Sequence, residues 1–274
     1  MTDVPETKPE SERLAPLSSE EKRNLLGLGI LAGAWVFVPA GLGFLLLARL
    51  GDLSDFYGSV AGSQGIAASI ALYAVLFGLT AGCGLLPTYA QAILGGWAFG
   101  LVGGTIGAMA GILVGAALGH GLSRLVSGDR VESVIRKRKQ VVAVRDALVR
   151  SGTLRSIGLV ALLRLSPNTP FALTNLVLGG SGTRLGVVLA GTAIGMLPRT
   201  ALAVGIAAAA VADGSRDLVD VVRQRGPVVP IVGVVILVVA VSVIAAIAKA
   251  ALKRAVPELA ADQSEASEPE SRDS

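Results

Sequence analysis

The stretch Arg164-Leu165-Ser166-Pro167-Asn168-Thr169-Pro170-Phe171 determines how the rest of the chain is interpreted. It lies in a strongly apolar region, yet it carries a guanidinium and two prolines within seven residues. Proline removes a backbone donor and blocks the helical hydrogen-bond ladder. Backbone groups freed in this way cannot face lipid, so such a break is tolerated only where protein or a water-lined cavity receives it. The stretch therefore predicts a broken helix beside a buried charge, which indicates a path or a binding site within a membrane.

The composition around this stretch is that of a polytopic membrane protein. The 274 residues are 52% hydrophobic and 16% charged, whereas a soluble domain carries about 25% charged residues. Residues 24–48, 56–123 and 226–248 contain no Asp, Glu, Lys or Arg. Because roughly 20 apolar residues cross a bilayer as a helix, each of these stretches is long enough to span it. We therefore expect an all-α membrane protein.

The chain divides into two polar tails and a membrane-embedded part. Residues 1–23 and the acidic residues 255–274 are rich in Glu, Ser and Pro, and we expect both tails to be disordered. Residues 24–63 are expected to form a first transmembrane helix, near 24–49, and a loop. Residues 64–254 are expected to form one membrane domain. Its predicted helices lie near 64–86, 102–124, 184–211 and 227–249, with broken segments near 87–101 and 156–181.

The connection over residues 124–155 is strongly basic. Nine cations face only three acids, and the cations are Arg124, Arg130, Arg136, Lys137, Arg138, Lys139, Arg145, Arg150 and Arg155. Basic loops stay in the cytoplasm, so this loop is predicted to be cytoplasmic. Lys249, Lys253 and Arg254 place the C-terminus on the same side. We expect a bacterial plasma membrane. The loop either fixes topology only or also contacts anionic lipid.

A weak internal repeat is present at a shift of 84 residues. Five glycine pairs coincide at this shift: Gly95 with Gly179, Gly96 with Gly180, Gly107 with Gly191, Gly111 with Gly195, and Gly121 with Gly205. Pro87 lies one residue out of register with Pro170. The repeat predicts two units, at about 84–124 and 164–211, each a re-entrant hairpin followed by a spanning helix. Because each unit crosses the membrane once, the second starts on the opposite side, so the repeat is expected to be inverted.

Arg164 and Arg199 are the strongest candidates for a functional role. A charge at the bilayer centre costs about 2.5–3.5 kcal/mol on insertion scales, so a cavity, backbone carbonyls or an anionic ligand must compensate it. The planar guanidinium suits phosphate. The alternative is that one or both arginines extend to the membrane interface. Asn175 could line a polar path or cap a half-helix.

Other chemistry is not indicated. The sequence has no phosphate loop, nucleotide-binding fingerprint, nucleophile elbow or metal-binding helix, and its single histidine, His120, has no acidic or cysteine neighbours. We therefore expect no catalytic residue, cofactor or metal, and no nucleic-acid partner. Glycines at every fourth position from Gly103 to Gly119 predict close helix packing, within the chain or in an oligomer.

The second unit resembles the signature of the SNARE-associated Golgi protein family, the VTT-domain family of the DedA superfamily. The resemblance rests on Arg164, Pro167, Pro170, Asn175 and Gly179, followed by Gly191, Gly195 and Pro198. The first unit matches more loosely, through Pro87, the turn at 95–100 and Arg124, and the resemblance covers roughly residues 80–210. It implies an integral membrane protein with two opposed re-entrant hairpins. The chain departs from the bacterial branch, whose members carry acidic residues near the first hairpin.

Relatives in this family are linked to lipid movement between leaflets, including recycling of polyprenyl phosphate carriers. The resemblance thus implies a protein that moves phospholipid or polyprenyl phosphate, with anionic head groups as ligands. Two alternatives stay open on the residues alone. One is a small-solute or ion transporter that uses the same path. The other is a membrane scaffold without transport activity.

Overall fold

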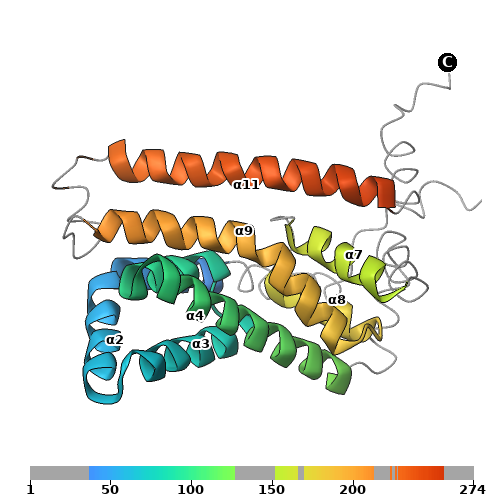
Figure 1. The fold of residues 1–274 in the computed structure, drawn as a ribbon, viewed down its shortest axis with the longest axis horizontal. Coiled ribbons are helices and arrows are strands. Elements are labelled where there is room, and N and C mark those ends of the chain that lie inside the picture. The colour runs from blue at the N-terminus through green and yellow to red at the C-terminus, as the bar shows by residue number, and fades with distance from the viewer. Residues whose placement is uncertain are drawn as a thin grey trace, which may run out of the picture.

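The computed structural model describes residues 37–126, 152–165, 170–212, 223, 226 and 228–255. This part of the chain is helical and has no strand, which confirms the predicted all-α class. Its elements are the helix Phe37–Ala48, α2 (Leu50–Gln64), α3 (Ile66–Gly82), α4 (Thr88–Val126), α7 (Thr153–Leu165), α8 (Phe171–Gly180), α9 (Leu185–Val211) and α11 (Val228–Ala255) (Figure 1). Both tails, most of the basic connection, Pro167 and Asn168 lie outside the described residues.

The segment 50–64 corrects the sequence interpretation, because it forms helix α2 and not a loop. It meets the helix Phe37–Ala48 at an angle of 70°. Leu50 and Tyr57 are buried, while Asp52 is exposed and pairs with Arg49 at 3.5 Å. Leu50, Leu53 and Tyr57 recur at helical spacing, so the apolar face of α2 packs on the core and its charged face points away. At Gly65, whose φ is 92°, the chain turns into α3.

The first unit contains the helix break that Pro87 predicts. Helix α3 ends at Gly82, and Pro87 precedes the first residue of α4. Helix α4 is itself interrupted at Gly100, where φ is 68° and ψ is −170°, a conformation that only glycine adopts readily. The unit is therefore α3, a short helix over 88–99 and a long helix over 101–126.

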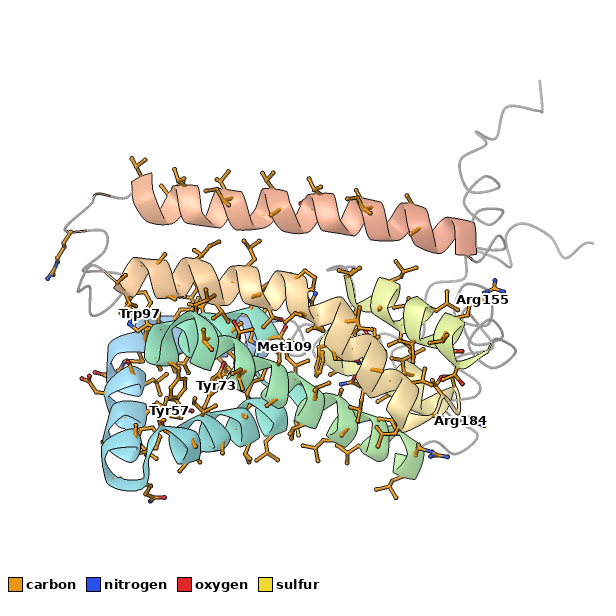
Figure 2. All side chains as sticks on the ribbon, in the orientation of Figure 1. Tyr57, Tyr73, Trp97, Met109, Arg155 and Arg184 are labelled. Atoms are coloured by element: carbon orange, nitrogen blue, oxygen red, sulfur yellow. The ribbon has the colours of Figure 1, made fainter. Side chains whose placement is uncertain are left out.

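These three helices follow a path that doubles back. Helix α3 runs from the α2 end of the molecule toward the middle, and the short helix returns, so that Trp97 lies at the α2 end (Figure 2). The long helix then crosses to the other end (Figure 1).

The second unit repeats this order as α7, α8 and α9. Pro170 is the N-cap of α8, so the predicted break at this proline is present. Helix α9 continues without interruption through Pro198. Helices α7 and α9 both begin at the end of the molecule opposite α2, which Arg155 and Arg184 mark in Figure 2.

The 84-residue shift therefore relates helices as well as glycines. Shifted by 84, the long helix 101–126 falls on 185–210, and α9 is Leu185–Val211. Shifted likewise, α3 falls on 150–166, and α7 is Thr153–Leu165.

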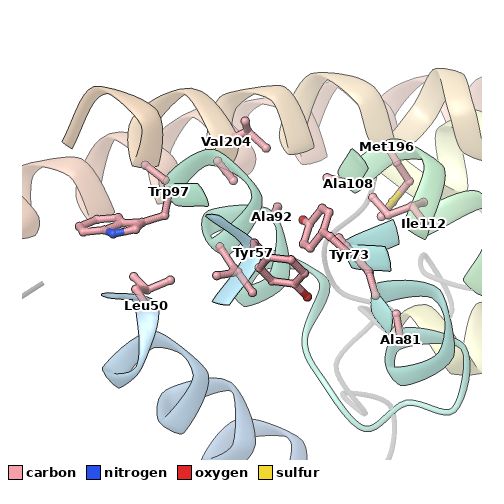
Figure 3. Close-up of a cluster of buried hydrophobic side chains, with 14 residues drawn as sticks. Leu50, Tyr57, Tyr73, Ala81, Ala92, Trp97, Ala108, Ile112, Met196 and Val204 are labelled. Atoms are coloured by element: carbon pink, nitrogen blue, oxygen red, sulfur yellow. The ribbon is translucent and has the colours of Figure 1, made fainter. Parts of the chain in front are cut away.

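The hydrophobic core lies mainly in the first unit, between α2, α3, α4 and α9. The rings of Tyr57 and Tyr73 meet edge to face with centroids 5.7 Å apart, and the ring of Phe99 lies 5.4 Å from each. Val204 and Met196 cover this cluster from α9 (Figure 3).

The glycine stripe of α4 packs inside the chain. A Cβ added at Gly107 would lie 2.8 Å from Cδ1 of Tyr73, and one at Gly111 would lie 2.6 Å from Cβ of Phe77. These glycines thus allow α3 to approach α4 closely, which is the packing role predicted for them. An oligomer stays a prediction.

Two helices, Thr88–Leu125 and Leu185–Val211, are long and apolar enough to cross a membrane. The bent pair Phe37–Ala48 and Leu50–Gln64 would add a third if it acts as one span.

Candidate functional site

Arg164 lies in the last turn of α7 and joins three helices. Its Nε donates to Oγ1 of Thr192 on α9 at 3.1 Å. Its Nη1 donates to the Phe171 carbonyl at 3.5 Å, and its Nη2 donates to Oδ1 of Asn175 on α8. The guanidinium carbon also lies 4.8 Å from the centroid of the Phe171 ring. The side chain is only 3% exposed, so the alternative in which it extends to the interface is wrong.

Asn175 extends this network to the first unit. Its Nδ2 donates to the Gly115 carbonyl on α4 at 3.4 Å, and the residue is fully buried. A Cβ at Gly119 would lie 2.8 Å from Cβ of Asn175, so the glycine leaves room for the amide. Asn175 is therefore neither a cap nor exposed to solvent: it links Arg164 to α4.

Arg199 lies on α9 in a different environment. It is 6% exposed, so it too is buried and does not reach the interface. Its Nη2 donates to Sδ of Met196 at 2.7 Å, and its guanidinium carbon lies 5.2 Å from the centroid of the Tyr89 ring. Tyr89 belongs to the short helix of the first unit, so this contact also joins the two units. Pro198, next to Arg199, is exposed.

Each short helix rests on the long helix of the other unit. A Cβ at Gly96 would overlap the Val204 carbonyl on α9. A Cβ at Gly179 would overlap the Ser123 hydroxyl and lie 2.8 Å from the His120 carbonyl on α4. Val204 is related to His120 by the 84-residue shift. The two glycines therefore occupy equivalent places in a reciprocal arrangement. Gly95 packs on Tyr73 of its own unit, and Gly180 ends α8.

The first unit has a neutral counterpart of the Arg164–Asn175 pair. Oγ1 of Thr80 donates to Oε1 of Gln91 at 2.8 Å, and these positions lie 84 residues before Arg164 and Asn175. The hydroxyl of Tyr73 donates to the Gln91 carbonyl at 2.7 Å. The same place in the fold is therefore polar in both units but charged only in the second.

No carboxylate is near enough in sequence or fold to neutralise the two buried arginines. Within the described ranges the only acidic residues are Asp52 and Asp55, both exposed on α2. The charge of Arg199 acts on Arg164, so the two cations repel each other. The same ranges contain no group of three His, Cys, Asp or Glu that could hold a metal ion. The arrangement is thus chemically suited to receive an anion.

Sequence reasoning identified Arg164, Asn175 and Arg199 but missed three partners. Thr192 and Tyr89 are ordinary residues in apolar helices and gave no signal of their own. The Thr80–Gln91 pair could have been found by applying the 84-residue shift to Arg164 and Asn175.

One comparison with known proteins gives a match. A family model described as the VTT domain matches residues 86–209, close to the 80–210 expected from the sequence. No curated protein and no solved structure matches the chain. Together with the apolar helices, the family match indicates an integral membrane protein.

Proposed function

Since residues 86–209 are a VTT domain, the domain of SNARE-associated Golgi and DedA membrane proteins, we propose that this chain moves lipid between leaflets. The ligand is the anionic head group of a phospholipid or of a polyprenyl phosphate. The head group passes near Arg164 and Arg199 while the acyl or prenyl tails stay in the surrounding lipid.

One observation carries this proposal: two guanidiniums are buried side by side in charge, and no carboxylate of the described residues pairs with them. A buried charge is costly unless it is paired. An anion that visits the site would supply the missing pairing, and arginine is well shaped for phosphoryl oxygens.

The path of the helices supports passage across the membrane. In the proposal the hairpin of α3 and residues 88–99 enters the bilayer from the α2 end, and the hairpin of α7 and α8 enters from the other end (Figure 1). The two units would then be an inverted repeat, the plan of many transporters. Their reciprocal contacts through Gly96 and Gly179 favour a two-fold relation between them.

The movement is proposed to be passive with respect to protons. Proton-coupled carriers usually use a buried carboxylate, and the described apolar helices after Asp55 contain none.

The test is leaflet exchange in vesicles that contain the purified full chain. Fluorescent phosphatidylglycerol, phosphatidylcholine and a short polyprenyl phosphate are placed in both leaflets, and the outer label is quenched chemically. We expect quenching beyond the half that empty vesicles allow, fastest for the anionic lipids. Equal quenching with and without protein, for every lipid, would reject lipid movement.

The same vesicles separate the alternatives. Uptake of small solutes or ions without lipid exchange would favour a solute transporter. Neither lipid exchange nor uptake, together with a stoichiometric protein partner bound to residues 124–155, would favour a scaffold.

A further inference from the structure

The two buried arginines differ in how many of their donors have partners. All three kinds of nitrogen of Arg164 donate to oxygen acceptors, on Thr192, Phe171 and Asn175. These acceptors come from α8 and α9, the two helices that follow the break at Pro170. Arg164 therefore already has a full structural task, which is to hold the second hairpin against its long helix.

Arg199 has no such set of partners. A guanidinium offers five N–H donors. The hydrogen bond that Arg199 makes goes to the sulfur of Met196, which is a weak acceptor. Its other close contact is the face of the Tyr89 ring. No oxygen acceptor for Arg199 is recorded among the described residues, although the side chain is 94% buried at its 6% exposure.

The hydroxyl of Tyr89 is a second, independent observation at the same place. This oxygen is buried and has no hydrogen-bond partner in the described chain. A buried hydroxyl normally has a partner. Tyr89 and Arg199 therefore present unused donors from the same contact, one from the first unit and one from the second.

We propose that Arg199 and Tyr89 form the subsite that binds a phosphoryl oxygen of the ligand, whereas Arg164 is a positioning residue. The identity of the ligand as a phosphate-bearing lipid rests on the proposed function. The subsite itself rests on the unused donors. Both the guanidinium and the phenol can donate to one phosphoryl group, and the anion would neutralise the buried cation. Because the two residues belong to different units, binding would also tie the units together.

The test measures thermal unfolding of the purified full chain in neutral detergent, with and without a water-soluble ligand. The probes are dioctanoyl phosphatidate, inorganic phosphate and dioctanoylglycerol, which has the same chains but no phosphate. A ligand that binds only the folded state raises Tm, and we expect a rise of about 5 °C for wild type with saturating phosphatidate and none with dioctanoylglycerol.

Four variants assign the roles of the residues. We expect Arg199→Gln to abolish the rise with phosphatidate, and to unfold without ligand at a Tm at least as high as that of wild type, because it removes an unpaired buried charge. Tyr89→Phe keeps the ring and loses the hydroxyl, so it should weaken phosphatidate binding roughly tenfold. Arg164→Gln should lower Tm by about 5 °C or more without ligand. The matched control is Arg184→Gln, because Arg184 is exposed at the start of α9 and should leave both measurements unchanged.

The outcomes separate this inference from the proposed function. A wild-type rise in Tm for Arg199→Gln with phosphatidate overturns the subsite, even if lipid exchange in vesicles is found. A rise that depends on Arg199 and Tyr89 supports it, even if no lipid exchange is found. An equal rise with inorganic phosphate also supports it and assigns the ligand to free phosphate instead of lipid. A larger loss of Tm in Arg199→Gln than in Arg164→Gln would overturn the division of roles.

Discussion

Arg164 and His120 are both buried, and the difference between them lies in their partners. The guanidinium of Arg164 donates to a hydroxyl, a carbonyl and an amide. Both ring nitrogens of His120 are buried without a hydrogen-bond partner in the described chain. A buried polar group left unpaired costs about 1–3 kcal/mol, so the imidazole weakens the packing where it lies.

His120→Leu should therefore increase the free energy of unfolding by about 1–3 kcal/mol, because leucine has a similar volume and no polar atom to satisfy. The measurement is the Tm of the purified chain in detergent. His120→Asn serves as the matched control, since it keeps a polar side chain and should give no gain. A Tm for His120→Leu below that of wild type would mean that the imidazole has a partner after all.

At this scale the sequence predicted the charged residues better than their partners. Arg164 and Arg199 were recognisable because a charge in an apolar stretch is unusual, whatever the fold. Thr192 and Tyr89 were not recognisable, because their importance comes only from the helices that pack beside them. The sequence also could not decide whether the arginines are buried or extend to the interface, which depends on tertiary packing.

At the scale of elements, the two short helices depend on glycine for their position. Gly96 and Gly179 lie against backbone carbonyls of α9 and α4, which cannot move aside. Gly158, in α7, has nothing within 4 Å of the place a Cβ would take. The three glycines are all helical, so the surroundings alone should decide the effect of an added methyl group.

Gly96→Ala and Gly179→Ala should each lower the free energy of unfolding by about 1–3 kcal/mol through overpacking. Gly158→Ala should raise it by about 0.5–1 kcal/mol, because alanine restricts the unfolded chain and favours a helix. Thermal unfolding of the three variants in detergent tests these opposite signs. Similar losses at all three positions would contradict the close approach at Gly96 and Gly179.

Helix breaks were easier to predict than the helix over 50–64. Pro87 and Pro170 remove backbone donors wherever they lie, so their effect is local and visible in the sequence. Helix α2 carries Asp52 and Asp55 among small and polar residues, and this composition led to its interpretation as a loop. It is stabilised by packing of Leu50 and Tyr57 on the core, which a local pattern does not reveal.

For the whole molecule, exposed charge separates along the long axis. Asp52 and Asp55 lie on α2 at one end, and Arg155 and Arg184 lie at the other (Figure 2). Since basic residues stay in the cytoplasm, the second end is predicted to be cytoplasmic. The basic connection joins the same end, because it runs between the end of α4 and the start of α7.

Labelling with a membrane-impermeant maleimide tests this orientation. In a Cys83→Ala background, Arg184→Cys should react only when the cytoplasmic face is accessible, and Ser63→Cys on α2 only from the outside. Detergent-permeabilised cells serve as the control in which both positions react. Reaction of both cysteines from the same face would reject the predicted crossing of the helices between them.

The repeat was the most informative feature of the sequence at this scale. A shift of 84 residues aligned five glycine pairs, and the same shift aligns the helices of the two units. The glycines were visible because each one marks a close approach between helices. Which helix approaches which was not visible, since a repeat in sequence does not say whether its copies pack internally or on one another.

The contacts of Gly96 and Gly179 cross between the units, and this has a consequence for ancestry. Translated alone, one half of the chain would leave its short helix without the surface on which it lies. A half-length ancestor with this architecture would therefore persist only as two copies clasped head to tail, each inserted in the opposite sense. Fusion of two such genes would preserve every contact while freeing the halves to diverge, so that one kept threonine and glutamine where the other acquired arginine and asparagine.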